Sequence, residues 1–144
     1  MQKAVLVSRC LLGEKCRWDG NILKDARLEK FEDRTMVPIC PEMDGGLPCP
    51  RPTSEIKGGN GFDILDGKSV VIDTEGRDVT DNYLRGAQVA LNKAYQEAVN
   101  MAYLKEGSPS CGVKTTYSDG RLVSSMGVTA ALLTRHGIKL VSAG

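Results

Sequence analysis

Three cysteines lie in turn-like sequence, where a purely structural thiol would not be expected. They are Cys10 in "SRCLLG", Cys40 in "ICPEMDGG" and Cys111 in "KEGSPSCGVK". A cysteine that serves only packing usually sits among apolar neighbours, because it behaves there as a small hydrophobic side chain. The chain has five cysteines, an odd number, and none belongs to a CxxC pair. In a reducing compartment this pattern favours metal binding or catalysis over a disulfide framework.

Each of these three cysteines follows an apolar run of strand length, and a fourth such run lies near the C-terminus. The four runs are 3–8, 35–39, 101–106 and 138–142. Continuous apolar runs are typical of strands that are buried on both faces of a parallel sheet. Helical spacing of apolar residues predicts helices over 23–32, 79–100 and 127–137, with Thr80 as the N-cap of the second helix.

Strands that alternate with helices predict an α/β fold, a three-layer Rossmann-like parallel sheet with right-handed crossovers. In such sheets ligands bind beyond the carboxyl ends of the strands, near a topological switch point. Because Cys10, Cys40 and Cys111 each follow a strand, their thiols are expected to meet at one edge of the sheet.

The segments between these elements carry weaker signals. Residues 41–61 contain too many prolines and glycines for a regular element and are expected to form a long functional loop. Residues 62–73 are typical of a hairpin that turns at Asp66-Gly67. A second hairpin is predicted over 115–123, with Asp119-Gly120 at its tip.

Size and composition narrow the class of protein. A chain of 144 residues is expected to form one domain over 1–144. The net charge of +1 and an aromatic content of 5% give no sign of a nucleic-acid partner. The N-terminus does not have the pattern of a signal peptide, and no apolar stretch approaches the ~20 residues of a membrane span, so we expect a cytoplasmic protein without a membrane partner.

Several thiolates at one place suit a soft metal or an iron–sulfur cluster. A structural zinc site would need a fourth ligand, for which Cys16 or Cys49 is available. A site of three cysteines would leave one iron of a [4Fe-4S] cluster open as a Lewis acid. Separately buried cysteines, or a redox pair such as Cys10–Cys16 or Cys40–Cys49, remain alternatives.

Three stretches in order, "SRCLLGEKCRWDG", "VPICPEMDGGLPCPRP" and "GSPSCG", resemble the thiouracil desulfidase family. The resemblance implies a compact α/β fold with an oxygen-sensitive [4Fe-4S] cluster held by Cys10, Cys40 and Cys111. It implies that Glu42 is the catalytic carboxylate and Ser108 the active-site serine. The implied activity is redox-neutral removal of sulfur from small thiolated pyrimidines of the 2- or 4-thiouracil type, in which Glu42 helps water to attack the carbon and sulfide is released.

Alternatives stay open for both the function and the residues. The chain could instead be a non-catalytic iron–sulfur or zinc module for sensing or sulfur delivery, or use the same site as a Lewis acid in another reaction such as a dehydration. Glu42 could be an ordinary loop carboxylate, and Ser110 is a substitute for Ser108. Arg51 could bind a phosphate or a carboxylate of the fold.

Two aromatic residues complete the set of candidates. Trp18, with Asp19 beside it, could line the pocket and stack on a flat pyrimidine. His136, the only histidine, precedes a glycine that ends a predicted helix, and it is better explained as a partner of the helix dipole than as a catalyst.

Overall fold

The centre of the protein is a parallel sheet of four strands. The computed structural model describes residues 4–13, 17–20, 26–31, 33–118 and 121–143. The four strands are β1 (Ala4–Ser8), β2 (Thr35–Ile39), β5 (Met101–Lys105) and β8 (Lys139–Ala143), in the spatial order β2-β1-β5-β8. All three neighbouring pairs are parallel. The predicted parallel α/β sheet is therefore confirmed, with its four strands close to the predicted positions.

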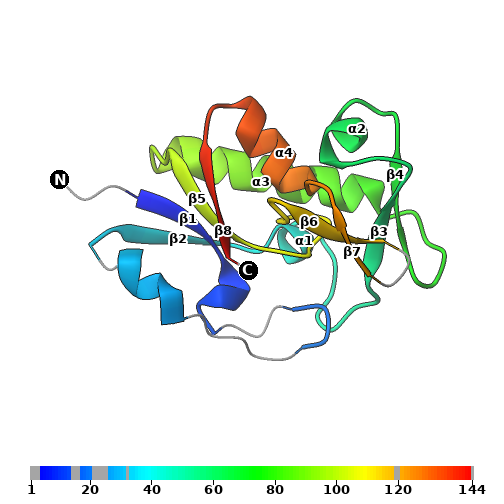
Figure 1. Cartoon of the computed structure of the whole chain (residues 1–144), viewed down its shortest axis with the longest axis horizontal. Coiled ribbons are helices and arrows are strands. Elements are labelled where there is room, and N and C mark those ends of the chain that lie inside the picture. The colour runs from blue at the N-terminus through cyan, green and yellow to red at the C-terminus, as the bar shows by residue number, and fades with distance from the viewer. Residues whose placement is uncertain (1–3, 14–16, 21–25, 32, 119–120, 144) are drawn as a thin grey trace.

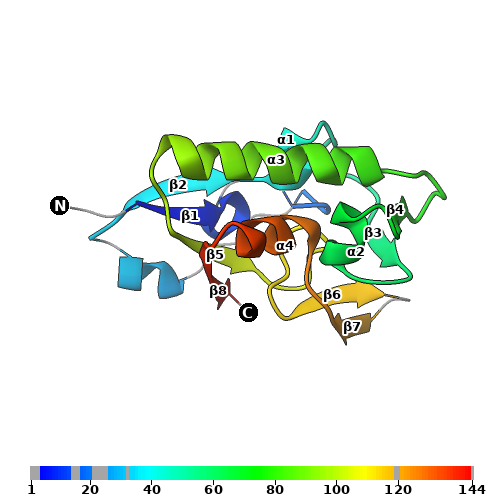
Figure 2. The same cartoon turned by 90° about the horizontal axis from the view of Figure 1, so that it is seen from above.

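Helices cover both faces of this sheet, because successive side chains of a strand point to opposite faces. On one face Leu6 and Leu104 pack against α3 (Thr80–Gln96) and α4 (Val128–Arg135). On the other face Val5, Val7 and Tyr103 pack against Phe31 of the 3₁₀ helix η2 (Ala26–Phe31). Figure 2 shows α3 on one side of the sheet and the short blue helix η2 on the other.

A smaller part of the fold lies beside the sheet, on the right in Figure 1. It contains α2 (Gly61–Leu65) and two antiparallel strand pairs, β3 (Ser54–Lys57) with β4 (Val70–Asp73) and β6 (Thr115–Ser118) with β7 (Arg121–Ser124). The predicted hairpin over 115–123 is confirmed, and its tip at 119–120 lies outside the described residues.

The predictions for 41–73 were wrong in two places. The segment 41–61 is not irregular throughout, since it contains α1 (Pro41–Asp44) and β3. Residues 62–73 do not form a hairpin, because residues 62–65 belong to α2 and β4 pairs with β3 instead. A capping box explains α2: the Asn60 side chain accepts from the amides of Phe62 and Asp63, and the Asp63 carboxylate accepts from the Asn60 amide.

The predicted helices differ from the observed ones at their ends. The N-cap of α3 is Val79 and not Thr80. The Thr80 hydroxyl instead accepts a hydrogen bond of 2.8 Å from the Val71 amide. Helix 23–32 is represented by η2, and residues 23–25 and 32 lie outside the described residues. In the part of the chain that the structure describes, no helix combines the length and apolarity that a membrane span requires.

Candidate active site

A pocket opens at the topological switch point of the sheet. The chain passes from β1 to β2 on one side of β1, whereas β5 and β8 lie on the other side, so the strand order reverses between β1 and β5. The pocket has a volume of about 580 Å³, and Cys10, Cys40 and Cys111 all line it. The structure therefore brings together the three cysteines that follow β1, β2 and β5.

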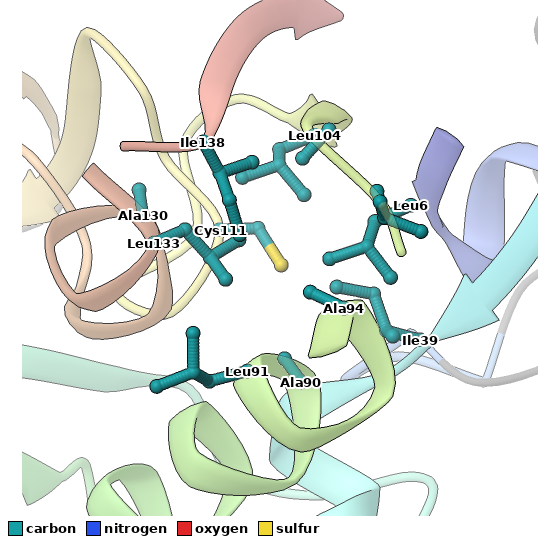
Figure 3. Close-up of a cluster of buried hydrophobic side chains, with 12 residues drawn as sticks. Leu6, Ile39, Ala90, Leu91, Ala94, Leu104, Cys111, Ala130, Leu133 and Ile138 are labelled. Carbon is teal, nitrogen blue, oxygen red and sulfur yellow. The ribbon is translucent and has the colours of Figure 1, made fainter. Parts of the chain in front are cut away.

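The three thiols differ in their surroundings. Cys10 lies in the 3₁₀ turn η1 (Arg9–Leu11) and is partly exposed. Cys40 is the N-cap of α1 and is 8% exposed. Cys111 is 6% exposed, and Figure 3 shows its side chain pointing in among the apolar residues of the core. Burial, together with the charges of Glu42 and Cys40, raises the pKa of Cys111 to about 12, against a hydrogen bond from Ser8.

Glu42 and Ser108 form a hydrogen-bonded pair on the pocket wall. Ser108 Oγ donates to Glu42 Oε2 at 3.0 Å. The same Oγ accepts from the amides of Ser110 at 3.0 Å and Cys111 at 3.1 Å. The pair therefore connects α1, which follows Cys40, to the turn that carries Cys111.

The other oxygen of Glu42 is bound by Arg51. Arg51 Nε donates to Glu42 Oε1 at 2.9 Å, and Arg51 Nη1 donates to the carbonyl oxygen of Pro48 at 3.0 Å. Burial lowers the pKa of Arg51, but the charge and hydrogen bond of Glu42 outweigh it and raise that pKa. Of the two roles expected for Arg51, the structure shows the contact with a carboxylate of the fold.

Tyr83 is a pocket residue that the sequence analysis missed. It lies on α3, is 1% exposed and lines the pocket. Burial, with the charge of Glu42 next in importance, raises its pKa well above 10. The available signal was a polar tip on the buried stripe of a helix, which requires a partner inside the fold.

Helix α1 rests directly on the backbone of α3. A methyl group on Gly86 would lie 1.8 Å from the carbonyl oxygen of Pro41, and one on Gly45 would lie 2.0 Å from that of Asn82. The Asn82 side chain also donates to the Gly45 carbonyl at 2.8 Å. These contacts fix the helix that holds Glu42.

Two further candidates lie away from the pocket wall. Ser110 Oγ is buried and lies 2.9 Å from Thr129 Oγ1 of α4, so Ser108 is the serine that contacts Glu42. Cys49 Sγ donates to the carbonyl oxygen of Arg17 at 3.1 Å, and it is not among the residues that line the pocket. Cys16, the other possible zinc ligand, lies outside the described residues.

Of the remaining candidates, Trp18 lies at the pocket, whereas Asp19 and His136 have partners elsewhere in the fold. Trp18 lines the pocket and is 48% exposed, whereas Asp19 forms an ion pair of 3.4 Å with Arg17. His136 is the C-cap of α4, as its sequence position indicated, and its Nδ1 lies 2.7 Å from the hydroxyl of Tyr95.

A single metal ion is not what this site resembles. Among the described residues, no group of three or more histidine, cysteine, aspartate or glutamate side chains is arranged to hold one ion. The three cysteines instead line one pocket, which the Glu42–Ser108 pair also lines. Fold and site thus define an α/β protein with a thiol-lined pocket at the switch point of a parallel sheet.

Comparison with known proteins gives the family. The chain belongs to the 2-thiouracil desulfurase family, whose model matches residues 5–144. A solved structure described as the [4Fe-4S]-dependent thiouracil desulfidase TudS superposes with a TM-score of 0.84 at 38% identity, covering 98% of this chain and 91% of that one. The uncharacterized protein YbbK of Bacillus subtilis (strain 168) is 39% identical in an alignment of 142 residues that covers 96% of this chain and 94% of YbbK.

Proposed function

We propose that this protein is an iron–sulfur-dependent desulfidase that converts thiolated pyrimidines of the 2- or 4-thiouracil type to the oxygen compounds. One observation carries the proposal: three cysteines from three separate strand ends line the same pocket as a hydrogen-bonded glutamate and serine. Family membership and the similarity to the desulfidase TudS support it.

The residues present fit a [4Fe-4S] cluster held by Cys10, Cys40 and Cys111. Such clusters are bound by cysteine thiolates, each on a different iron, so the thiols must surround a space rather than converge on one point. The cysteines line a cavity of about 580 Å³ and form no single-ion site among the described residues. When bound, a cluster with three protein ligands supplies a Lewis acid at its fourth iron, with an affinity for sulfur.

The chemistry assigned to the chain is a hydrolysis. Water adds to the carbon of the C=S group, the C–S bond breaks, and the products are the C=O compound and hydrogen sulfide, with no change in oxidation state. Proton transfers accompany both bond changes, so a group that accepts and returns a proton near the carbon accelerates the reaction. No external electron donor is required.

Glu42 is the group that we assign to these proton transfers. A carboxylate offers about four lone-pair directions, and Arg51, Ser108 and the buried hydroxyl of Tyr83 engage three of them. We assign the remaining direction to a water or a ring nitrogen in the pocket. Ser108 fixes the orientation of the carboxylate, because its own oxygen is held by two backbone amides.

The test is turnover of 2-thiouracil and 4-thiouracil by protein that is purified and loaded with iron and sulfide under anaerobic conditions. Glu42→Gln keeps the shape of the side chain but exchanges protons poorly, so uracil release per cluster is expected to fall by roughly two to four orders of magnitude. Glu97→Gln makes the same chemical change at the exposed end of α3 and is expected to keep wild-type activity.

The controls separate the proposed enzyme from its alternatives. Iron and acid-labile sulfide are counted in every sample, so that activities are compared at equal cluster content. A wild-type protein that binds the cluster but releases no uracil would be a binding or sulfur-delivery module. Wild-type activity in Glu42→Gln at equal cluster content would remove Glu42 from the mechanism. The cytoplasm, which we expect from the sequence, is a reducing compartment that suits such a cluster.

A further inference from the structure

Exposed apolar side chains gather around the mouth of the pocket. Among the described residues five large hydrophobic side chains are exposed: Trp18, Val70, Tyr95, Tyr117 and Leu122. Three of these five, Trp18, Tyr117 and Leu122, line the one pocket that holds the cysteines. Single exposed apolar residues need no explanation, but a group of them around a polar site indicates a binding surface.

Tyr117 and Leu122 belong to one structural unit, the β6–β7 hairpin. They are directly opposite each other in the antiparallel register, so their side chains lie on the same face. Tyr117 is 47% exposed and Leu122 is 53% exposed. Figures 1 and 2 both place this hairpin beyond the carboxyl end of β5. The segment that joins β5 to β6 carries Ser108 and Cys111.

Gly107 brings this apolar pair close to the reacting groups. A methyl group on Gly107 would lie 3.3 Å from Leu122 Cδ2 and 3.4 Å from Tyr117 Cε2, so both side chains pack over this glycine. Gly107 immediately precedes Ser108, which donates to Glu42. The hairpin therefore presents an apolar surface beside the Glu42–Ser108 pair.

Of the four positively charged side chains that line the pocket, three are paired with carboxylates of the protein, and the fourth, Lys105, donates to the carbonyl oxygen of Glu106 at 3.3 Å. Arg9 is paired with Asp44 at 3.1 Å, Arg17 with Asp19 at 3.4 Å and Arg51 with Glu42 at 2.9 Å. Trp18, Tyr117 and Leu122 add an exposed apolar surface to this lining. An uncharged planar heterocycle suits it, because stacking and apolar contact hold such a ring without a counter-charge.

We infer that Tyr117 and Leu122 form the wall against which the ring of the substrate is held, and that they determine which rings the pocket accepts. This inference rests on the proposed function for the identity of the ring, a thiolated pyrimidine. The wall positions the ring, and Glu42 and Ser108 act at its edge. Trp18, from a distant part of the sequence, contributes a second aromatic surface to the same mouth.

The test measures binding separately from turnover. Trp18 is the only tryptophan of the chain and lines the pocket, so its fluorescence reports on a ligand there. Cluster-loaded protein carrying Glu42→Gln is titrated anaerobically with 4-thiouracil, which it consumes slowly. Adding Tyr117→Ala is expected to weaken binding about five- to one-hundred-fold, the range found when an aromatic stacking partner of a base is removed.

Further variants distinguish the ring surface from other effects. Tyr117→Phe keeps the ring and is expected to bind within about twofold of its parent. Leu122→Ala and Leu122→Asn, the second of which preserves the size of the side chain, are both expected to weaken binding. Tyr95→Ala and Val70→Ala remove the exposed apolar side chains outside the pocket and are expected to bind as the parent does. In protein that retains Glu42 and is therefore active, the same Tyr117 and Leu122 variants are expected to raise KM more than they lower kcat.

Each outcome decides something definite. If Tyr117→Ala and Leu122→Asn bind 4-thiouracil as the parent does, and thermal unfolding shows that they are folded, the inference that Tyr117 and Leu122 hold the ring is wrong. Absence of 4-thiouracil binding by the parent would overturn it as well. Normal binding with no turnover by wild-type protein would refute the proposed function, while the variants would still decide whether the wall holds the ring.

Discussion

Glu42 and Arg51 are oppositely charged side chains that line the pocket, and each depends on the other. The Arg51 side chain is 5% exposed and the Glu42 side chain 15% exposed, with 2.9 Å between Nε and Oε1. A shielded ion pair contributes little net stability compared with apolar packing, but removing one partner leaves the other charge without compensation. Replacing one partner is therefore expected to lower the free energy of unfolding by much more than the ion pair itself contributes to it.

Arg51→Met is accordingly expected to lower the free energy of unfolding by roughly 3 kcal/mol or more, measured by denaturant titration of cluster-free protein. The control is Lys57→Met, which breaks the ion pair with Glu55; the Lys57 side chain is 48% exposed. Exposed pairs contribute about 0–1 kcal/mol, so the control loses less. Equal losses in the two variants would show that burial does not set the cost at Arg51.

At the scale of elements, the loop from β5 to β6 is closed by one carboxylate. Glu106 accepts hydrogen bonds from the amides of Val113, Lys114 and Thr115 and from the hydroxyl of Ser142. Burial raises the pKa of Glu106, but the hydrogen bond from Ser142 and those from the loop outweigh burial and lower it. The loop that carries Ser108 and Cys111 is thus fastened to itself and to β8.

This arrangement predicts a dependence of stability on pH. Because the folded-state pKa is lowered, the stabilisation is fully present above the unfolded pKa, about 4.3, and is lost as the pH falls through the folded pKa. Glu106→Gln is expected to lower the free energy of unfolding at about pH 7 and to remove part of the loss between about pH 5 and pH 2. Denaturant unfolding across this range is the measurement, with Glu29→Gln, an exposed carboxylate of η2, as control. A slope in acid equal to that of wild type would contradict the assignment.

Elements with strong apolar patterns could be predicted from the sequence. The prediction was wrong where a local turn signal pointed to a hairpin and the capping residues of a helix pointed to α2. The four parallel strands lie at the short apolar runs of strand length from which they were predicted. Asp66-Gly67 is typical of a hairpin turn, yet it follows α2 because Asn60 and Asp63 form a capping box. The strand β4 pairs with β3, which lies on the other side of α2 in the sequence, and the residues around Asp66-Gly67 do not determine this pairing.

For the whole molecule, the sheet is what assembles the pocket. Cys40 and Cys111 are 71 residues apart in the chain (111 minus 40), and both line it. The three cysteines, Glu42 and Ser108 could be proposed from strand ends and motifs. Tyr83 and the hairpin side chains could not, because their approach to the pocket depends on how α3 and β6–β7 pack.

If the three thiols hold one cluster, each of Cys10→Ser, Cys40→Ser and Cys111→Ser is expected to abolish or sharply reduce cluster binding after anaerobic loading. Cys49→Ser is the matched control, because this thiol donates to a backbone carbonyl and does not line the pocket. Iron and sulfide content with the visible absorption of the cluster gives the answer. Full cluster content in one of the first three variants would remove that cysteine from the ligand set, and loss in all four would point to an additional ligand.

The contact of α1 with α3 has a consequence for how tolerance to substitution is interpreted in this chain. Gly45 and Gly86 have no room for even one methyl group, and neither lines the pocket. Any side chain at either position separates the two helices and displaces Glu42 with α1. Gly45 and Gly86 take no part in the reaction, yet substitution at either position is expected to be tolerated as poorly as substitution of a catalytic group. In this fold, strict dependence on a residue's identity reports on the spacing of helices as readily as on the reaction.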